Sequence, residues 1–318
     1  MKKTMRIVFC GSSGFAVPAL RALAGSRHEV VYVLTQPARP AGRGVKVRHT
    51  HVAQTAGELG LPLAECANIN EPTMVEAIRG HEPDLIYVVD FGQMVRAAVR
   101  ATAAMGAYNL HGSLLPELRG AAPVNWAIIR GYRQTGVSFF SLADRMDAGE
   151  VFATAQTAIG AEETAEELHG RLAEIGAQVG LKVVDDIEAG SARGVAQDDS
   201  KATLAPKLKK EDGRLDFAEP AAALAGRING TWPWPGGQAM LVAHDGREMP
   251  VTIARALAHE GPATGEPGVL DAELMIAAGA GRVQVLEIQP AGKKRMPWKA
   301  FLNGCRLAAG DRFVSVKA

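Results

Sequence analysis

The stretch MRIVFCGSSG, residues 5–14, is a short apolar run that ends in a glycine-rich turn. This pattern predicts a buried β-strand followed by a sharp change of direction. The turn lacks the third glycine of a dinucleotide fingerprint, since Val17 stands in that place, and it contains no Walker lysine. We therefore interpret it as a tight strand-to-helix turn. The helix after it is expected to bury one face, formed by Ala16, Ala19, Leu20 and Leu23.

Further apolar runs of similar length follow along the first half of the chain. Runs that are apolar throughout, separated by helical segments, are typical of a parallel sheet covered on both faces. The sequence therefore predicts an α/β domain at the start of the chain. The expected strands lie at 30–34, 85–89, 107–110, 138–142 and 151–157.

The clearest helix is predicted over residues 164–187. Thr164 and Glu167 have the spacing of a capping box, in which each side chain binds the backbone of the other residue. Apolar residues then recur at intervals of three and four, from Leu168 to Val183. This helix is expected to close the first domain.

Residues 190–210 are rich in Gly, Ser, Ala and Lys, which is typical of a linker. Beyond them a short helix is predicted over 221–228, followed by alternating apolar runs split by turn residues. These runs, at 238–243, 251–256, 274–277 and 283–288, favour a small antiparallel barrel or sandwich. The expected domains are thus 1–189 and 211–318, joined by a linker over 190–210.

Composition excludes several classes of protein. Of the 318 residues 47% are hydrophobic, which is enough for a substantial core and excludes a disordered chain. The net charge of +1 excludes a global basic field, so nucleic-acid binding has to use local patches. Cys10, Cys66 and Cys305 form no disulfide framework or CxxC pair, and the eight histidines form no HExxH-type cluster. With no secretion signal and no membrane span in the sequence, we expect a cytoplasmic protein without a metal site.

The segment NLHGSLLPELRGAAP, residues 109–123, carries the strongest functional signal. Asn109 and His111 are two residues apart, so on extended backbone their side chains point to the same side. They lie at the carboxyl end of a predicted strand, where parallel sheets place their sites. A lone histidine in a loop is most simply structural, but an amide beside it at a strand end favours a functional pair.

A carboxylate from the segment DRMDAGE, residues 144–150, is expected to face His111 and to set its charge and tautomer. Spacing alone does not choose between Asp144, Asp147 and Glu150. Asp144 with Arg145 also fits a solvated turn.

Three clusters of basic residues interrupt a nearly neutral chain. The segment 36–48 carries four cations and no acid, and its Gly and Pro residues indicate a loop. Such a loop suits phosphate contacts, although a run of charge by itself is more often only a solvated surface. Two further clusters lie at 207–210 and 293–299.

Together these motifs resemble the methionyl-tRNA formyltransferase family, over essentially the whole chain. The motif at 109–123 and the DAGE segment at 147–150 are shared with other enzymes that use formyltetrahydrofolate, so they indicate the chemistry. Two narrower motifs point to the tRNA enzymes, QPARPAGRG at 36–44 and QPAGKK at 289–294.

The resemblance implies an α/β fold: a Rossmann-like formyltransferase domain with a mainly parallel sheet, followed by a small OB-like β-barrel domain. It implies transfer of the formyl group of 10-formyltetrahydrofolate to the α-amino group of methionine on initiator methionyl-tRNA, without a metal. The family's catalytic Asn, His and Asp correspond to Asn109, His111 and Asp147, which selects the carboxylate that spacing left open. His111, charged by Asp147, and the Asn109 amide would stabilise the oxyanion, while Asp147 would help to remove the proton of the attacking amine.

The same resemblance assigns binding residues and partners. We expect initiator methionyl-tRNA and folate as partners, no DNA, no membrane, and a monomer. The folate would contact Ser113, Leu114, Leu115 and Pro116, and also Val89, Phe91 and Gly92. The tRNA would contact Arg39, Arg43, Lys46, Arg48, Lys207, Lys293 and Lys294.

The chain departs from the family pattern at Leu118, where Tyr is often found, at Asp90 near the expected pterin pocket, and in its first glycine turn. Three other functions compete. An N-formyltransferase for an amino-sugar nucleotide would keep the three catalytic residues but would not need the basic segments. A folate- or RNA-binding protein without turnover is disfavoured by the intact trio. A formyltetrahydrofolate hydrolase would resemble only the first domain.

Overall fold

The computed structural model describes residues 4–41 and 46–316, and the chain divides into two compact units. The first unit combines Met1–Pro123, Gly136–Thr157 and His169–Ala205. The second combines Val124–Thr135, Ala158–Leu168 and Pro206–Ala318. The units therefore exchange segments along the chain, whereas the sequence analysis expected domains that follow one another.

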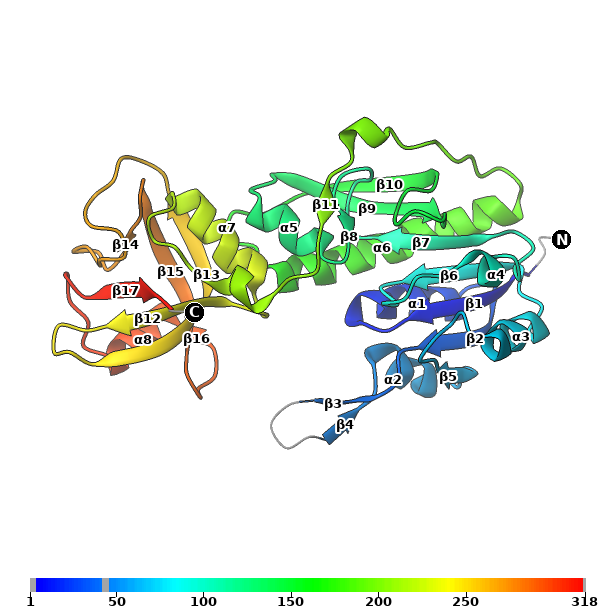
Figure 1. The fold of residues 1–318 in the computed structure, drawn as a ribbon, viewed down its shortest axis with the longest axis horizontal. Coiled ribbons are helices and arrows are strands. Elements are labelled where there is room, and N and C mark those ends of the chain that lie inside the picture. Colours follow the sequence, from blue (N-terminus) through cyan, green and yellow to red (C-terminus); the bar gives the residue numbers. More distant parts are fainter. Residues whose placement is uncertain (1–3, 42–45, 317–318) are drawn as a thin grey trace. The chain divides into compact units, whose positions relative to one another are not determined.

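The first unit is built on a seven-stranded sheet with the order β10-β9-β7-β6-β1-β2-β5 (Figure 1). The pairs β1–β2, β1–β6, β2–β5 and β6–β7 are parallel, and β9 is antiparallel to β7. This confirms the mainly parallel sheet that the apolar runs predicted. The strands are β1 (Arg6–Gly11), β2 (Glu29–Thr35), β5 (Leu63–Glu65), β6 (Leu85–Val89), β7 (Ala107–His111), β9 (Gln134–Ser141) and β10 (Val151–Ala158).

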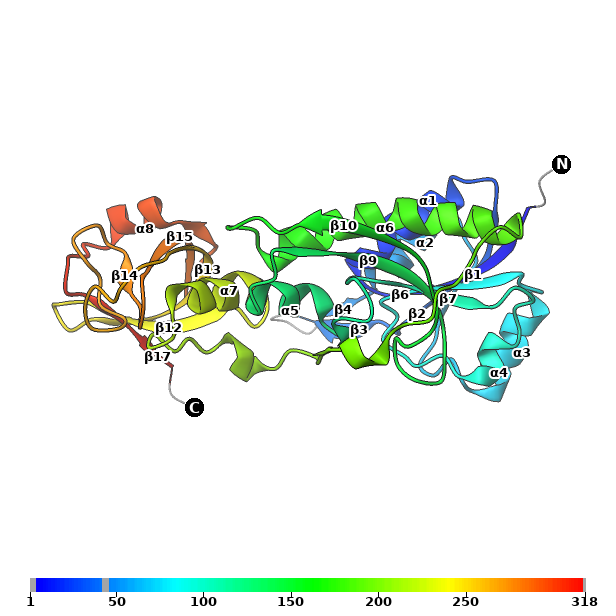
Figure 2. The same ribbon diagram turned by 90° about the horizontal axis from the view of Figure 1, so that it is seen from above.

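Helices cover both faces of this sheet, because its central strands are apolar on both sides. Figure 2 shows α1 and α6 on one side and α3 and α4 on the other. Ile86 and Val88 of β6 belong to the core cluster that includes residues of α3 and α4, while Tyr87 points toward Gly180 of α6. The helices of this unit are α1 (Val17–Ala24), α2 (His51–Glu58), α3 (Pro72–Gly80), α4 (Ala97–Arg100) and most of α6 (Ala165–Glu188), whereas α5 (Pro123–Ile129) belongs almost entirely to the second unit.

Two local predictions are confirmed in detail. Ser13 caps a short 3-10 turn, η1 (Gly14–Ala16), by accepting a hydrogen bond from the Phe15 N–H, and α1 follows directly. At the start of α6, the Thr164 N–H donates to the Glu167 carboxylate at 3.0 Å and the Glu167 N–H donates to the Thr164 hydroxyl at 3.4 Å. These are the two bonds of a capping box.

The basic segment 36–48 differs from the expected loop, because part of it forms a hairpin. Strand β3 (Arg39–Ala41) pairs antiparallel with β4 (Lys46–Arg48). The backbone hydrogen bonds of a two-stranded pair form even where Pro and Gly suggest irregular chain, since Pro40 can take an edge position.

Residues 190–205, expected as part of a linker, lie along the first unit. Val195 forms an isolated bridge with Val151, and β11 (Leu204–Ala205) pairs with β8 (Arg119–Gly120). A short 3-10 turn, η2 (Asp199–Lys201), lies between them. Most of the segment is exposed, as its polar composition indicated, but Gln197, Asp199 and Thr203 also make hydrogen bonds to distant residues, which composition does not reveal.

The second unit is an antiparallel, barrel-like sheet around one apolar core, as the alternating runs predicted. The strand order is β14-β15-β13-β12-β17, with β16 paired to β15. Its strands are β12 (Gly237–Val242), β13 (Glu248–His259), β14 (Ile276–Ala277), β15 (Arg282–Pro290), β16 (Met296–Pro297) and β17 (Arg312–Ser315). Its helical segments after residue 206 are η3 (Lys210–Gly213), α7 (Ala221–Thr231) and α8 (Trp298–Gly304).

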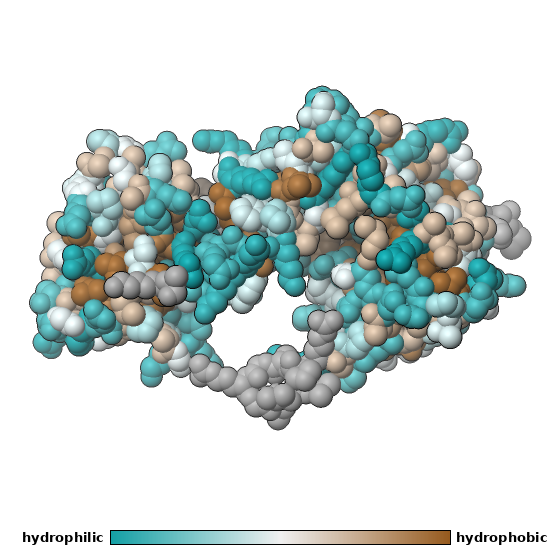
Figure 3. All heavy atoms as spheres, viewed as in Figure 1, coloured by the Kyte–Doolittle hydropathy of each residue, from teal (hydrophilic) through white to brown (hydrophobic). Residues whose placement is uncertain are grey.

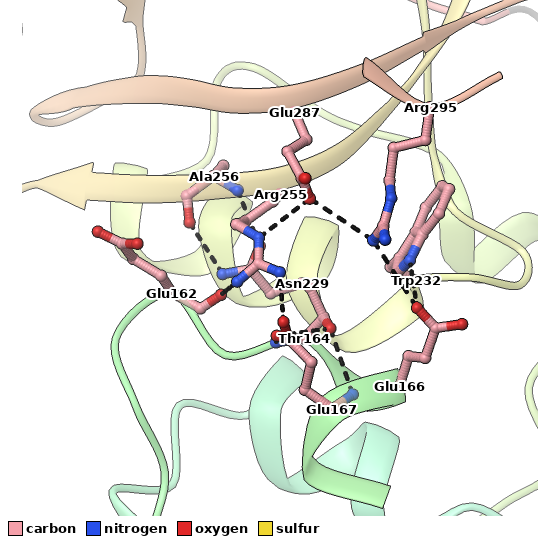
Figure 4. Close-up of polar contacts among 10 residues, drawn as sticks. All are labelled: Glu162, Thr164, Glu166, Glu167, Asn229, Trp232, Arg255, Ala256, Glu287 and Arg295. Carbon is pink, nitrogen blue, oxygen red and sulfur yellow. Dashed lines mark hydrogen bonds and ion pairs between the residues drawn. The ribbon is translucent and has the colours of Figure 1, made fainter. Parts of the chain in front are cut away.

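The first turn of α6 belongs to the second unit, and a polar cluster joins it to the barrel (Figure 4). Arg255 of β13 forms ion pairs with Glu167 and, at 3.1 Å, with Glu287 of β15. Arg295 lies over the Trp232 ring, with its guanidinium carbon 5.2 Å from the ring centroid. This cluster fixes a helix end to two strands through side chains that are only partly buried.

On the face drawn in Figure 3, hydrophobic residues form small patches between hydrophilic ones. Across the part of the chain that the structure describes, no helix is both long enough and apolar enough to cross a membrane.

Candidate active site

The candidate site is built at the carboxyl end of β7. Leu110 packs against Gly176 of α6, so Asn109 and His111 point to the opposite face of the sheet. Strand β7 is parallel to β6 on one side and antiparallel to β9 on the other, with Asn109 opposite Phe140 and His111 opposite Ser138. The shared orientation expected from the two-residue spacing is therefore present.

The His111 ring is held by the backbone. Its Nε2 lies 2.9 Å from the carbonyl oxygen of Leu118, and the residue is only 6% exposed. A carbonyl oxygen only accepts hydrogen bonds, so Nε2 carries the hydrogen in this arrangement. The sequence analysis expected a carboxylate to set the tautomer; here the Leu118 carbonyl does so. The other nitrogen, Nδ1, is left facing Asp147.

Asp147 is the carboxylate that reaches the histidine. Its Oδ2 lies 3.9 Å from His111 Nδ1 and accepts a hydrogen bond from the Gly120 N–H at 2.8 Å. Asp144 instead pairs with Arg100 and is 86% exposed at its side chain, and Glu150 is exposed. The geometry thus brings together His111 and the carboxylate that the resemblance had selected.

Two acceptor atoms at this site have no partner. The Asn109 Oδ1 is buried and accepts no hydrogen bond from any described residue. The described residues also donate no hydrogen bond to Asp147 Oδ1, since the Gly120 bond uses Oδ2. A buried unpaired acceptor costs about 1–3 kcal/mol, so Asn109 Oδ1 calls for a donor that the described residues do not supply.

The segment expected to line the folate forms a tight turn beside β9. The Ser138 hydroxyl donates to the Ser113 carbonyl at 2.7 Å and accepts from the Leu115 N–H at 3.0 Å. The Ser113 hydroxyl donates to the Glu117 carbonyl at 2.7 Å. Ser113 and Leu115 are buried, whereas Leu114 and Pro116 are half-buried.

The other expected folate positions follow β6. Val89 and Phe91 are buried in the core, so their side chains are packed, and only Gly92 is exposed. The Phe91 carbonyl accepts hydrogen bonds from the Ser12 hydroxyl and the Gln36 amide, each at 3.3 Å. The turns after β1, β2 and β6 therefore meet at the carboxyl edge of the sheet.

The departures at Asp90 and Leu118 both fall on unusual backbone. Asp90 has φ +42° and Leu118 has φ +58°, in the left-handed region that non-glycine residues seldom occupy. Asp90 is exposed, and its charge partly opposes the effect of burial, which lowers the pKa of His169. Leu118 is buried and carries the carbonyl that binds His111.

The expected tRNA-binding positions are distributed over both units. Arg39 and Lys46 lie in the β3–β4 hairpin, Arg48 is exposed at its end, and Arg43 lies outside the described residues. The expected positions Lys207, Lys293 and Lys294 in the second unit are exposed, and no carboxylate of the described residues lies within ion-pair distance of them.

Two residues close to His111 and Asp147 were not identified from the sequence. Gln197 and Thr203 both lie in the segment taken as a linker and bind the backbone next to Asp147 and His111. Neither stands in a periodic pattern or a motif, so the sequence held no signal for them. No group of three or more His, Cys, Asp or Glu that could hold a metal ion is found within residues 4–41 and 46–316.

Comparison with known protein families agrees with this architecture. Residues 5–184 match the formyl transferase family, and residues 207–306 match the formyl transferase C-terminal domain. A methionyl-tRNA formyltransferase from Solibacter usitatus is 41% identical over 313 residues, which is 97% of this chain and 98% of that protein.

Two solved structures share the fold at low sequence identity. An N-formyltransferase from Helicobacter canadensis, in complex with folinic acid and dTDP-3-aminofucose, has a TM-score of 0.63 at 13% identity. The match covers 92% of this chain and all of that one. HypX from Aquifex aeolicus in complex with tetrahydrofolic acid has a TM-score of 0.60 at 18% identity, covering 94% of this chain and 47% of that one. With matches to both domains and a relative 41% identical along almost its whole length, this chain belongs to the methionyl-tRNA formyltransferase family of formyl transferases.

Proposed function

We propose that this protein transfers the formyl group of 10-formyltetrahydrofolate to the α-amino group of methionine on initiator methionyl-tRNA, before translation initiation. The name of the relative from Solibacter usitatus supports the reaction and the tRNA substrate. The tetrahydrofolate in the fold neighbour from Aquifex aeolicus supports folate binding.

The reaction is an attack by an amine on a formamide-like carbonyl. The methionine nitrogen forms a bond to the formyl carbon, the bond from that carbon to N10 of the folate breaks, and the proton lost by the amine ends on N10. A negative charge develops on the formyl oxygen between these events, so a donor aimed at that oxygen lowers the barrier.

His111 supplies such a donor in its protonated form. Its Nε2 is occupied by the Leu118 carbonyl, so Nδ1 is the nitrogen directed at the reacting groups. The 3.9 Å between Nδ1 and Asp147 Oδ2 lets one atom lie about 2.8 Å from both, within hydrogen-bonding reach of each. The folate contacts would come from residues 113–116 and from Val89, Phe91 and Gly92.

The unpaired Asn109 Oδ1 is the observation that carries this proposal. It is an acceptor at the end of β7, and the attacking amine brings the N–H that it lacks. The amide nitrogen of the same side chain is a donor for the oxyanion. Asp147 Oδ1, which the chain also leaves unpaired, takes the proton of the amine directly or through a water.

The tRNA would be held by basic residues other than the catalytic residues Asn109, His111 and Asp147. Arg39, Arg43, Lys46 and Arg48 on the first unit, and Lys207, Lys293 and Lys294 on the second, would neutralise phosphates and release counterions. The protein would act in the cytoplasm as a monomer without a metal. The proposed division by function is a formyltransferase domain over 1–189 and a tRNA-binding barrel over 211–318. Residues 190–210 connect them along the sequence, and of these 190–205 belong to the first unit.

The test is a transfer assay with 10-formyltetrahydrofolate labelled in its formyl group. We expect label on methionyl initiator tRNA and none on a 3-amino sugar nucleotide. Label on the sugar alone would instead assign the chain to amino-sugar formylation. Release of formate without either acceptor would indicate a hydrolase, and binding of both substrates without transfer would indicate a binding protein.

A further inference from the structure

We propose that Gln197 and Thr203 are positioning residues that hold His111 and Asp147 in their mutual arrangement. The inference rests on the proposed function for what this arrangement does. Both residues lie in the segment 195–205, here called the strap. The strap does not join two strands of the main sheet but runs beside the site within the first unit.

Backbone pairing fixes the two ends of the strap. At one end the N–H and carbonyl of Val195 bind those of Val151, both at 2.9 Å. At the other, β11 pairs with β8, and the Ala205 carbonyl also accepts from the Ala122 N–H at 3.2 Å. Gly120 makes this contact possible, because its φ is +125° and a Cβ there would lie 2.5 Å from the Ala205 carbonyl oxygen. Because the strap is held at both ends, the side chains between these ends have defined positions.

Gln197 clamps the turn that carries Asp147. Its Nε2 donates to the Asp147 carbonyl at 2.8 Å and to the Gly149 carbonyl at 2.7 Å. Its Oε1 accepts from Arg119 at 2.7 Å and 3.1 Å. Asp147 has φ +51°, so it occupies backbone that it would leave if nothing held it. The two bonds hold the carbonyl of this strained residue and the carbonyl two residues after it.

Thr203 clamps the residue that orients His111. Its hydroxyl accepts from the Leu118 N–H at 2.8 Å, and its carbonyl accepts from the Arg119 N–H at 2.8 Å. Leu118 also has left-handed backbone, and its carbonyl binds His111 Nε2. Thr203 therefore acts on the histidine through one intervening residue.

Arg119 joins the two clamps. Its guanidinium binds Gln197 and, at 2.9 Å, Asp199, and the residue is 8% exposed. The next residue, Gly120, donates its N–H to Asp147 Oδ2. A single chain segment, 118–120, thus contacts the histidine, the strap and the carboxylate in succession.

This arrangement bears on rate because reacting groups tolerate little displacement. A shift of about 1 Å at a catalytic group can cost about a hundredfold in rate. Without the strap's hydrogen bonds, Leu118 and Asp147 are free to relax toward common backbone conformations. The Leu118 carbonyl and the Asp147 carboxylate would then move away from His111, while the surfaces that bind folate and tRNA would stay in place.

The Gln197 side chain has two roles: its amide N–H groups hold the Asp147 turn, and its oxygen binds Arg119. Two variants separate these roles. Gln197→Met removes both roles, whereas Gln197→Glu keeps an oxygen for Arg119 and loses the two donors. We expect kcat to fall about tenfold in both, with KM for each substrate within about twofold. A Gln197→Glu variant with the parent's kcat would mean that the Gln197 amide only supports Arg119. That result would overturn the proposed role of Gln197 in positioning Asp147.

Thr203 offers a matched pair. Thr203→Val removes the hydroxyl at constant shape, and Thr203→Ser retains it. We expect kcat to fall about tenfold in Thr203→Val and to stay within about twofold of the parent value in Thr203→Ser. Thr102→Val is the control, because it also loses one hydroxyl-to-backbone bond in the first unit, to the Val99 carbonyl, before β7 begins. It should leave kcat unchanged.

A spectroscopic readout decides the inference without using activity. In protein labelled with ¹⁵N-histidine, with the His111 signals identified by their loss in His111→Gln, we expect hydrogen on Nε2 in the parent and in Thr203→Ser. In Thr203→Val we expect a mixture with the Nδ1 tautomer. An unchanged His111 signal in Thr203→Val, with folding intact by circular dichroism, overturns the role of Thr203. Failure of the proposed function would appear differently, as an absence of formyl transfer by the parent protein.

Discussion

Asn109 at the end of β7 and Asn229 on α7 place the same side chain in two different surroundings. Asn229 is 2% exposed, and its amide binds both backbone groups of Ala256 on β13, at 2.9 Å each. Figure 4 shows this pair beside the cluster around Arg255, where the polar groups find partners within the chain. The Oδ1 of Asn109 is buried as well, but no described residue donates to it.

The comparison contrasts a polar group that holds the fold with one that, under the proposed function, binds the substrate. A fully paired buried amide ties a helix to a strand and recovers the cost of its own desolvation. An unpaired one is a net cost to the folded chain unless another molecule completes it. The buried hydroxyls of Tyr87 and Thr135 are also unpaired among the described residues, so Asn109 is distinguished by its place beside His111 at the end of β7. The predictions below test this distinction.

The largest expected effect is on the histidine at the unpaired site. His111→Ala should lower kcat by about 10²–10³, by analogy with removal of one oxyanion donor. Steady-state transfer assays would measure it, and binding of a folate to the variant, followed by fluorescence, should persist. Full turnover with an intact fold would remove His111 from the mechanism.

The next comparison replaces each asparagine by an apolar residue of similar size. Asn229→Leu should lower the free energy of unfolding by about 2–4 kcal/mol, because it strands the N–H and carbonyl of Ala256. Asn109→Leu should leave stability within about 1 kcal/mol, since it removes an acceptor that was already unpaired, yet it should lower kcat at least tenfold. Urea unfolding and transfer assays on both variants give the result. Equal destabilisation would show that Asn109 is a scaffold residue too.

A smaller effect is expected from the basic residues. Arg43→Ala and Lys293→Ala should each raise the KM for methionyl-tRNA a few-fold and reduce the slope of log KM against log salt by about one. Lys182→Ala is the control, because Lys182 already pairs with Asp186 on α6 at 2.6 Å. A salt slope identical to the parent's would exclude the altered residue from the tRNA contacts.

The smallest effect concerns the ion pairs of the second unit. Burial raises the pKa of Glu167, but hydrogen bonds from Arg255 and Thr164 more than offset this, so its pKa lies below the ordinary 4.5. The resulting stabilisation is present above pH 4.5 and is lost as the pH falls through the lower value in the folded state. Glu167→Gln should therefore cost about 1 kcal/mol or less at pH 7, and the difference should shrink in acid. Unfolding at a series of pH values measures this, and a difference that grows in acid would contradict it.

Features that depend on neighbours in sequence could be predicted. The capping box of Thr164 and Glu167, the buried face of α1 and the common orientation of Asn109 and His111 all follow from spacing, because three-, four- and two-residue intervals fix direction within one element. The apolar runs likewise predicted the parallel sheet, since strands buried on both faces need no alternation.

Features that depend on distant pairing could not. The β3–β4 hairpin forms where Pro and Gly indicated loop, and residues 190–205 contact the site where their composition indicated a linker. Gln197 stands in no motif, and its role follows from hydrogen bonds to residues about fifty and eighty positions away.

The sequence by itself determined which groups are available, an imidazole and an amide at a strand end and three carboxylates some thirty to forty residues later, because residue type and local period are encoded in neighbours. Spacing left the choice of carboxylate open, the family resemblance selected Asp147, and the tertiary structure brings Asp147 to the ring. Only the tertiary structure decided which nitrogen of that ring carries the hydrogen, and which amide oxygen is left without a donor. These features arise because residues 118–120 and the strap lie beside the end of β7. Packing and hydrogen bonds between segments far apart in the sequence determine that placement.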